Sequence, residues 1–233
     1  LGADNGIGVA SIMTVLASST IEHPAIEALF TIDEETGMTG ALNLKAGVLK
    51  GKILLNLDTE DDKELTIGCA GGIDVTATGS FTHEAAPPNS VFYGIYVKGL
   101  TGGHSGMDIY KGRGNSNKIM NRVLLSAFEK FGFQIATIDG GSLRNAIPRE
   151  SVAEIALEES KINDFEVFIR TISDELEFEY KTTDPNFSVT AKPLEIKKRV
   201  LQKGFQLKLM KSLYACANGI YRMSPDIEHL VQT

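Results

Sequence analysis

The sequence lacks three features that would each point to a class of protein. Among its 233 residues it has only two cysteines, Cys69 and Cys216, far apart in the chain. It has no block of lysine or arginine, and its net charge is −7. No apolar run approaches the roughly 18–20 residues of a membrane-spanning helix. These absences argue against a disulfide framework, nucleic acid and an anionic membrane, and they favour the reducing cytoplasm.

What the sequence does contain is the composition of an ordinary globular protein. Hydrophobic residues make up 42% and charged residues 23%, so the chain can bury a sizeable core. Its length suffices for one large domain or two small ones. The chain opens with LGADNGIG, without a Met, and ends with EHLVQT. We therefore expect it to be a piece of a longer polypeptide.

The first third has the pattern of an α/β domain. A helix is predicted over 4–19 and a short helix over 36–47, from capping residues and apolar spacing. Short apolar runs at 25–32 and 50–58 predict buried strands, and 64–72 predicts a hairpin or edge strand. Helices that alternate with strands indicate a parallel sheet with crossover helices.

The pattern changes near residues 72–90, where 72–80 alternates as a half-exposed strand does and a turn-rich connector follows. The expected elements beyond it are strand 91–100, helix 115–131, strands 133–141 and 151–159, helix 163–180 and strand 186–193. Their βαββαβ order is that of a ferredoxin-like α+β domain. A further amphipathic helix is predicted over 193–215. We expect part of a catalytic α/β domain at 1–71 and a second, incomplete domain at 72–233.

Acidic side chains follow the predicted strands of the first domain. Glu34 and Glu35 come directly after one strand, Asp58 ends the next, and Asp4 lies at a helix start. Because sites in open parallel sheets form beyond the carboxyl ends of the strands, these acids are expected at one edge. Carboxylates so close together need a cation, or one of them must take up a proton.

The adjacent pair Glu34 and Glu35 allows a division of roles. Neighbouring side chains in an extended segment point to opposite sides, so the two can straddle a site. One carboxylate could bind a metal while the other accepts a proton from a metal-bound water. The alternative is that 33–35 is only a solvated loop and Asp4 only a helix cap.

Six segments together resemble the di-zinc peptidase family that contains Xaa-His dipeptidases, carnosinases and glutamate carboxypeptidases. They are LGADNGIGVA, TIDEETGMTGA, NLDTEDD, GCAGGID, GLTGGHSGMDI and GGSLRNAIPRE. The resemblance implies that Asp4 bridges two Zn²⁺ ions, with Co²⁺ or Mn²⁺ as alternatives. It implies that Glu35 and Asp58 each bind one metal and that Glu34 is the general base. Asp33 matches no functional position and is expected on the rim.

The second domain resembles the lid and dimerisation domain of this family, which implies a homodimer. His104, in GGHSG, would donate to the oxyanion of the tetrahedral intermediate. Asn145 and Arg144, in LRNAIP, would contact the substrate, and the planar fork of Arg144 suits its terminal carboxylate. On its own, a His in such a turn would be an ordinary surface residue.

The function implied is zinc-dependent hydrolysis of dipeptides, with Xaa-His dipeptides such as carnosine favoured. The alternatives are a related tripeptidase or N-acyl amino acid amidohydrolase, a non-catalytic dimerisation fragment, or a simple acidic cation-binding protein. The family's metal-binding His-x-Asp motif, upstream of GADNG, and its C-terminal His have no match in this chain. Asp4, Glu35 and Asp58 form an all-oxygen set, which would favour a harder ion or bind zinc weakly. We therefore expect these residues alone not to hydrolyse dipeptides efficiently.

Overall fold

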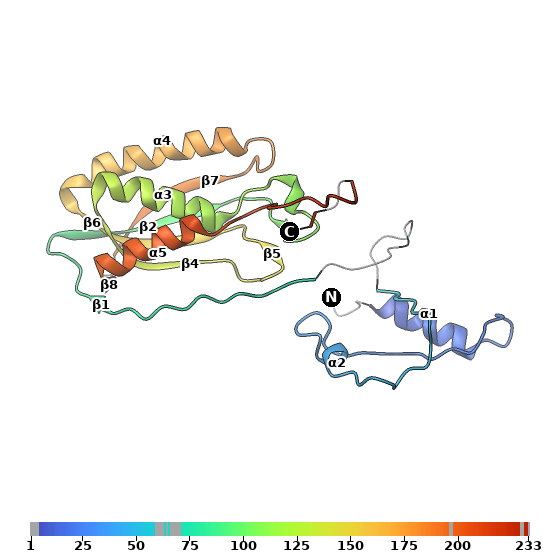
Figure 1. Ribbon diagram of the computed structural model, residues 1–233. Helices are drawn as coiled ribbons and strands as arrows, with labels where there is room; N and C mark the ends of the chain where they lie inside the picture. Colours follow the sequence, from blue (N-terminus) through green and yellow to red (C-terminus); the bar gives the residue numbers. More distant parts are fainter. Residues whose placement is uncertain are drawn as a thin grey trace. The chain divides into compact units, whose positions relative to one another are not determined.

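The computed structural model describes residues 5–58, 63, 65, 71–195, 198–228 and 231–232 (Figure 1). The chain divides into two compact units, Leu1–Val75 and Thr76–Thr233, here called the N-terminal and C-terminal units. Each is described by itself. Among the described residues, none of the helices is both long and apolar enough to cross a membrane.

A four-stranded antiparallel sheet forms the centre of the C-terminal unit. Its strands, in the spatial order β4-β6-β2-β7, are β4 (Gln134–Gly140), β6 (Ser151–Glu158), β2 (Ser90–Lys98) and β7 (Ser188–Leu194). Helix α3 (Ser116–Phe131) follows β2, and α4 (Ile162–Tyr180) follows β6. The chain order of these elements is the βαββαβ order expected from the sequence.

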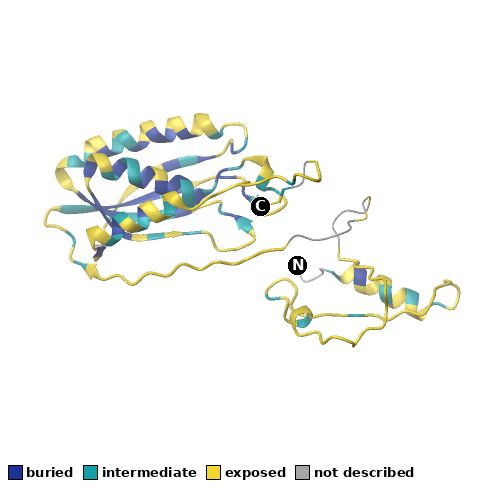
Figure 2. Cartoon of the chain, viewed as in Figure 1, coloured by how far each residue is buried: buried dark blue, intermediate teal, exposed yellow. Residues whose placement is uncertain are grey.

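The core of this unit lies between the sheet and its helices. Along β2, Tyr93, Ile95 and Val97 alternate with residues of the other face and belong to one buried cluster. The same cluster takes side chains from α3, α4 and α5 (Lys203–Ala215), so the three helices cover one face of the sheet (Figures 1 and 2). A smaller cluster around Phe92 and Val200 lies on the opposite face.

Helix α3 begins and ends where its sequence provides caps. The Asn115 side chain accepts the backbone N–H of Asn117 at 3.0 Å and of Lys118 at 3.3 Å, which satisfies two free donors of the first turn. The helix ends at Gly132, whose φ of 66° is the left-handed conformation usual after a last turn. These caps place the helix start directly after the loop that carries His104.

The long helix predicted over 193–215 is wrong in its first part. Strand β7 runs on to Leu194, and Val200–Leu201 form a two-residue strand, β8, that pairs with β1 (His83–Glu84). The described helix, α5, begins only at Lys203. Both β8 side chains are buried, Leu201 in the larger cluster and Val200 in the smaller one, so their apolar character reflects packing in the core and not a helical face.

Helix α5 is joined to the edge of the sheet by a buried amide. Gln206 is 0% exposed; its Nε2 donates to the Phe133 carbonyl at 3.1 Å, and its Oε1 accepts from the Ile135 N–H at 2.7 Å. Because β4 is an edge strand, these two backbone groups would otherwise have no partner in the ladder. One side chain therefore completes the edge of the sheet.

The N-terminal unit contains two helices within its described residues, α1 (Gly6–Ala17) and α2 (Thr39–Leu42). Both were expected, although α2 is shorter than predicted and ends well before Gly47. Asn5 caps α1, with its Oδ1 accepting from the Gly8 N–H at 2.8 Å.

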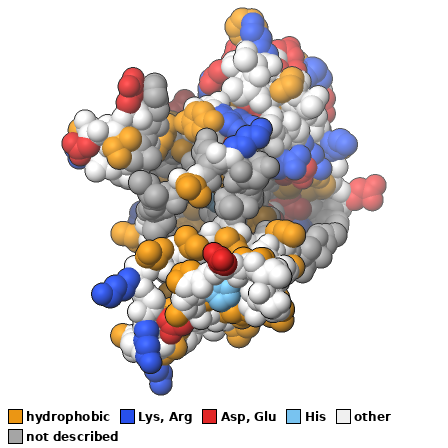
Figure 3. All heavy atoms as spheres, turned by 90° about the vertical axis from the view of Figure 1, so that its right-hand side faces the viewer, with side chains coloured by type: hydrophobic (Ala, Val, Ile, Leu, Met, Phe, Trp, Pro, Cys, Tyr) orange, Lys and Arg blue, Asp and Glu red, His pale blue; other side chains and the backbone are white. Residues whose placement is uncertain are grey.

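The buried strands predicted at 25–32 and 50–58 are wrong for the described chain, which has no strand in these segments. Ile53, Leu54 and Leu55 are 84%, 78% and 79% exposed. A buried parallel strand needs neighbouring strands at its edges and helices on its faces, and the described part of this unit contains no neighbouring strand. Most described residues of this unit are accordingly exposed (Figure 2), and hydrophobic side chains lie open on the molecular surface (Figure 3).

The strand expected at 72–80 is also not observed, since Ile73 and Val75 are 90% and 86% exposed in unpaired extended chain. Alternation alone cannot make a strand without a partner to accept its hydrogen bonds. Most of the hairpin or edge strand expected at 64–72 lies outside the described residues.

Replacement of Gln206 by leucine should destabilise the C-terminal unit. Gln206→Leu keeps the approximate volume but leaves one buried N–H and one buried C=O unsatisfied, which costs about 2–6 kcal/mol at about 1–3 kcal/mol for each group. Urea denaturation followed by circular dichroism would measure the loss. The matched control Gln202→Leu changes an exposed glutamine without a side-chain cap bond and should stay within about 0.5 kcal/mol.

Candidate functional site

The loop that carries His104 is fastened at both ends by one buried carboxylate. Asp184 is 1% exposed and accepts the backbone N–H of Thr101 at 2.8 Å and of Gly114 at 2.9 Å. It also accepts the Thr183 hydroxyl at 2.7 Å. Three donors around one carboxylate offset its desolvation. The loop from 101 to 114 therefore has a fixed base.

Within this loop, His104 and Asp108 are joined by reciprocal hydrogen bonds. The His104 N–H donates to Asp108 Oδ2 at 2.8 Å, and the Asp108 N–H donates to the His104 carbonyl at 3.0 Å. Lys111 Nζ lies 2.6 Å and Arg113 3.6 Å from the Asp108 carboxylate. The hydrogen bond from Lys111, followed by that from the His104 N–H, lowers the pKa of Asp108 below its ordinary value. The carboxylate is therefore ionised at neutral pH.

The imidazole of His104 is held on one side by the backbone. Its Nδ1 lies 3.1 Å from both the Gly106 and the Met107 amide nitrogens, each of which donates its N–H to the ring. The residue as a whole is exposed. The ring is thus anchored through Nδ1 and open at its other nitrogen.

Gly103 is required by the close approach of these charged groups. Its φ is +143°, and a Cβ built there would lie 2.5 Å from both Asp108 Oδ2 and Arg113 Nη1. Any side chain would separate these atoms or strain the backbone. Steric crowding therefore explains why the second residue of GGHSG is a glycine.

Backbone pairing brings the two motifs of the C-terminal unit together. Strand β3 (Gly103–His104) pairs antiparallel with β5 (Ala146–Ile147), and His104 lies opposite Ala146. The Ser105 N–H donates to the Asn145 carbonyl at 2.8 Å. His104, Asn145 and Arg144, which the sequence analysis selected from separate motifs, therefore lie in neighbouring segments. Asn145 and Arg144 are both exposed.

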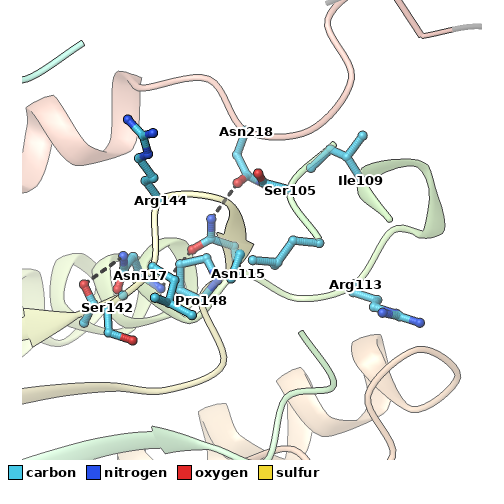
Figure 4. A pocket seen from close by; sticks show the side chains of 14 residues that line it. Ser105, Ile109, Arg113, Asn115, Asn117, Ser142, Arg144, Pro148 and Asn218 are labelled. Carbon is cyan, nitrogen blue, oxygen red and sulfur yellow. Dashed lines mark hydrogen bonds between the residues drawn. The ribbon is translucent and has the colours of Figure 1, made fainter. Parts of the chain in front are cut away.

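A pocket of about 550 Å³ opens beside this pairing (Figure 4). It is lined by hydroxyl and amide groups and by apolar side chains, which come from the β3–β5 region, from the start of α3 and from the segment after α5. Asn115 Nδ2 donates to Asn218 Oδ1 at 2.7 Å across it, as Figure 4 shows. Arg144 and Arg113 lie at the pocket's margins. The lining is mixed polar and apolar, and one wall is the loop that carries His104.

The acidic residues of the N-terminal unit are only partly described. Asp4 lies outside the described residues. Its neighbour Asn5 donates from Nδ2 to the Leu57 carbonyl at 2.6 Å, and Leu57 directly precedes Asp58. This hydrogen bond joins the residue before α1 to the end of the 50–58 segment.

Asp33 is the structural residue of the acidic triplet. Its φ is +60°, and its carboxylate accepts hydrogen bonds from the Thr36 and Thr39 hydroxyls. These two bonds, the first of them the larger influence, lower the pKa of Asp33. Glu34 and Glu35 are exposed on the turn that Asp33 closes. The expectation that Asp33 is only a rim residue therefore misses its role in shaping the turn.

The described residues do not by themselves make a metal centre. Within the described ranges, no three His, Cys, Asp or Glu side chains gather as metal ligands would. Glu35 and Asp58 supply only oxygen, and a two-zinc centre needs more ligands than these, with nitrogen among them. The described donors therefore do not fit the predicted zinc pair.

Comparisons with known proteins agree with this architecture. Residues 95–184 match the family model of a peptidase dimerisation domain. The matched segment begins in β2 and ends at Asp184, so it contains the His104 loop, the β3–β5 pairing and α4. Over these residues, the C-terminal unit is similar to a peptidase dimerisation domain.

Two relatives match nearly the whole chain. The cytosol non-specific dipeptidase of Escherichia coli (strain K12) is 37% identical over 233 residues, which are 100% of this chain and 48% of that protein. The crystal structure of aminoacylhistidine dipeptidase from Vibrio alginolyticus superposes with a TM-score of 0.77 at 40% identity, over 99% of this chain and 47% of that one. The resemblance to aminoacyl-histidine dipeptidases is confirmed over the length of this chain, which spans about half of each relative.

Two residues that shape the site were not selected from the sequence. Asp108 lies four residues after His104, at a spacing that suits a side-chain contact within one turn, and a search for such contacts could have found it. Asp184 lies 83 residues from Thr101, and no local pattern links the two. Only the fold shows that Asp184 serves the His104 loop.

Protonation of Asp33 should loosen the turn that carries Glu34 and Glu35. Because the folded pKa is below the ordinary value of 3.8, the ionised carboxylate stabilises the turn above that pH and ceases to do so as the pH falls through the lowered value. An NMR titration of the Asp33 carboxyl carbon would measure this. Thr39→Val should raise the pKa of Asp33 toward 3.8. Thr14→Val, which removes an exposed hydroxyl within α1, should leave it unchanged.

Removal of the Asp184 carboxylate should release both ends of the His104 loop. Asp184→Ala leaves the Thr101 and Gly114 N–H groups without acceptors, at a cost of about 2–5 kcal/mol in unfolding free energy. Denaturant unfolding measures the cost, and amide exchange should quicken at both residues. Asp174→Ala, on the exposed side of α4, is the control and should change stability by less than about 0.5 kcal/mol. Unchanged exchange at Thr101 and Gly114 would contradict the role given to Asp184.

Proposed function

We propose that the protein carrying this chain is a metallopeptidase that hydrolyses dipeptides, with Xaa-His dipeptides such as carnosine preferred. The observation that carries the proposal is the β3–β5 pairing, which sets His104 beside Asn145 and next to a pocket of mixed polar and apolar lining. The likeness to two dipeptidases along nearly the whole chain supports it. Residues 1–71 would be part of the catalytic domain and 72–233 the lid and dimerisation domain.

Glu34 is the proton carrier in this proposal. Its carboxylate would accept a proton from the attacking water and return it to the amine of the departing product. Glu34 is exposed, and it lies on a turn whose backbone is held by the hydrogen bonds of Asp33. A zinc pair held with Asp4, Glu35 and Asp58 would acidify water and polarise the peptide carbonyl. Since the described donors do not fit that pair, its remaining ligands must come from other residues.

His104 and the LRNAIP motif act on the substrate from the C-terminal unit. The ring of His104 would donate to the oxygen that becomes negative when water adds to the peptide carbonyl. Asn145 would bind a substrate amide or carbonyl. Arg144, at the margin of the pocket, would pair with the terminal carboxylate, which its planar fork fits. Both residues are exposed.

The assembly proposed is a homodimer formed through the C-terminal unit, in keeping with the dimerisation-domain match. A cytoplasmic location is proposed from the cytosolic relative and from the presence of only two cysteines. The alternative activities, a tripeptidase or an N-acyl amino acid amidohydrolase, differ in substrate. A panel of Xaa-His dipeptides, other dipeptides, tripeptides and N-acyl amino acids would separate them.

Glu34→Gln should abolish most of the activity of the full-length enzyme with carnosine. The amide cannot accept the proton of the attacking water, so kcat should fall about 10²–10⁴-fold with little change in fold. The control Glu22→Gln alters an exposed glutamate in the same unit and should keep full activity. Full activity of Glu34→Gln would refute the role of Glu34. Wild-type enzyme that binds metal and dimerises, yet hydrolyses no member of the panel, would favour the non-catalytic alternative.

A further inference from the structure

The two hydrogen bonds at Nδ1 determine which nitrogen of neutral His104 carries the proton. The Gly106 and Met107 N–H groups, both with nitrogens 3.1 Å from Nδ1, are donors and cannot accept. Nδ1 must therefore offer them a lone pair. A neutral imidazole has one protonated nitrogen, so the proton lies on Nε2.

The turn that creates this arrangement is closed by Asp108. Its carboxylate accepts the His104 N–H at 2.8 Å, while its own N–H donates to the His104 carbonyl at 3.0 Å. Gly106 and Met107 lie between these two residues, and the closure turns their N–H groups back toward the ring. Asp108 touches the backbone of His104 and not its ring.

The position of Asp108 is in turn set by two cations. Lys111 binds one carboxylate oxygen at 2.6 Å, and Arg113 lies 3.6 Å from the other. Arg113 also donates to the Gly102 carbonyl at 2.5 Å, which ties the carboxylate to the chain on the other side of His104. Gly103 leaves the room for this contact, because a Cβ there would collide with both Asp108 and Arg113.

We propose that Asp108 is a positioning residue that fixes His104 as the Nε2–H tautomer, with that N–H directed to the reacting carbonyl oxygen. The proposal rests on the function proposed above. The tautomer matters because an Nδ1–H ring would present the lone pair of Nε2 to a developing negative charge and repel it. A donor that is already oriented needs no rearrangement during the reaction.

The tautomer can be measured without any assay of activity. Long-range ¹H–¹⁵N correlation spectra of the ¹⁵N-labelled full-length protein, at a pH where the ring is neutral, distinguish protonated from unprotonated ring nitrogens. The His104→Gln spectrum identifies the signals of His104 by their disappearance. We expect wild-type His104 to show an unprotonated Nδ1 and a protonated Nε2. A wild-type ring protonated on Nδ1 would overturn the proposal.

The variant Asp108→Asn removes the charge that Lys111 and Arg113 hold and should loosen the turn. We expect the two ring-nitrogen signals to move toward each other as both tautomers become populated. With carnosine, kcat should fall about tenfold with KM within about twofold, because an interaction made mainly in the transition state is weakened. The matched control Asp174→Asn, on the exposed face of α4, should change neither the spectrum nor kcat.

The outcomes separate this proposal from the proposed function. An Asp108→Asn variant that keeps both the wild-type spectrum and the wild-type kcat would overturn the positioning role, while dipeptidase activity stands. If the wild-type protein hydrolyses no dipeptide, the proposed function fails, and the spectra still decide whether Asp108 sets the tautomer. A purely structural role for Asp108 would lower stability without moving the ring-nitrogen signals, and that result would also overturn the proposal.

Discussion

The arrangement of the C-terminal unit around its candidate site depends on the buried carboxylate of Asp184. A carboxylate at this depth is costly unless every oxygen has a donor, and Asp184 takes its donors from both ends of one loop and from Thr183. Its need for partners therefore holds the 101–114 loop against the end of α4. The β3–β5 pairing and the His104 turn are built on that base.

The two units differ in how much of their apolar surface they bury. The C-terminal unit buries a continuous core between sheet and helices and satisfies its edge strand with Gln206. The N-terminal unit leaves Ile53, Leu54 and Leu55 largely exposed, at a cost of roughly 1.5–3 kcal/mol for each such side chain not buried. These side chains have the composition of a buried strand, and covering them would require further strands or helices.

Where sequence reasoning succeeded, local pattern and tertiary context agreed. Helix α3 has a cap at Asn115, a glycine after its last turn and helical apolar spacing, so its bounds could be predicted closely. Strands were predicted at 25–32 and 50–58 but are not observed there, because a parallel strand depends on neighbouring strands that the local sequence does not contain. Val200–Leu201 were predicted to be helical because two adjacent apolar residues fit the periodicity of a helix as well as that of a strand. In the site, motifs selected His104 and Asn145, but Asp184 could be recognised only in the fold.

The amide of Asn115 has a consequence for which residue this position accepts. At a helix start, Asn, Asp, Ser and Thr are nearly interchangeable, since each offers an oxygen to the first N–H groups. Here the other end of the side chain donates to Asn218, 103 residues away. Aspartate would keep the cap and lose that donor, and serine and threonine would not reach so far. Asparagine is therefore the one common capping residue that can make both contacts, and a conservative-looking exchange at residue 115 would remove one of the hydrogen bonds that join the start of α3 to the segment after α5; the bonds from Lys118 would remain.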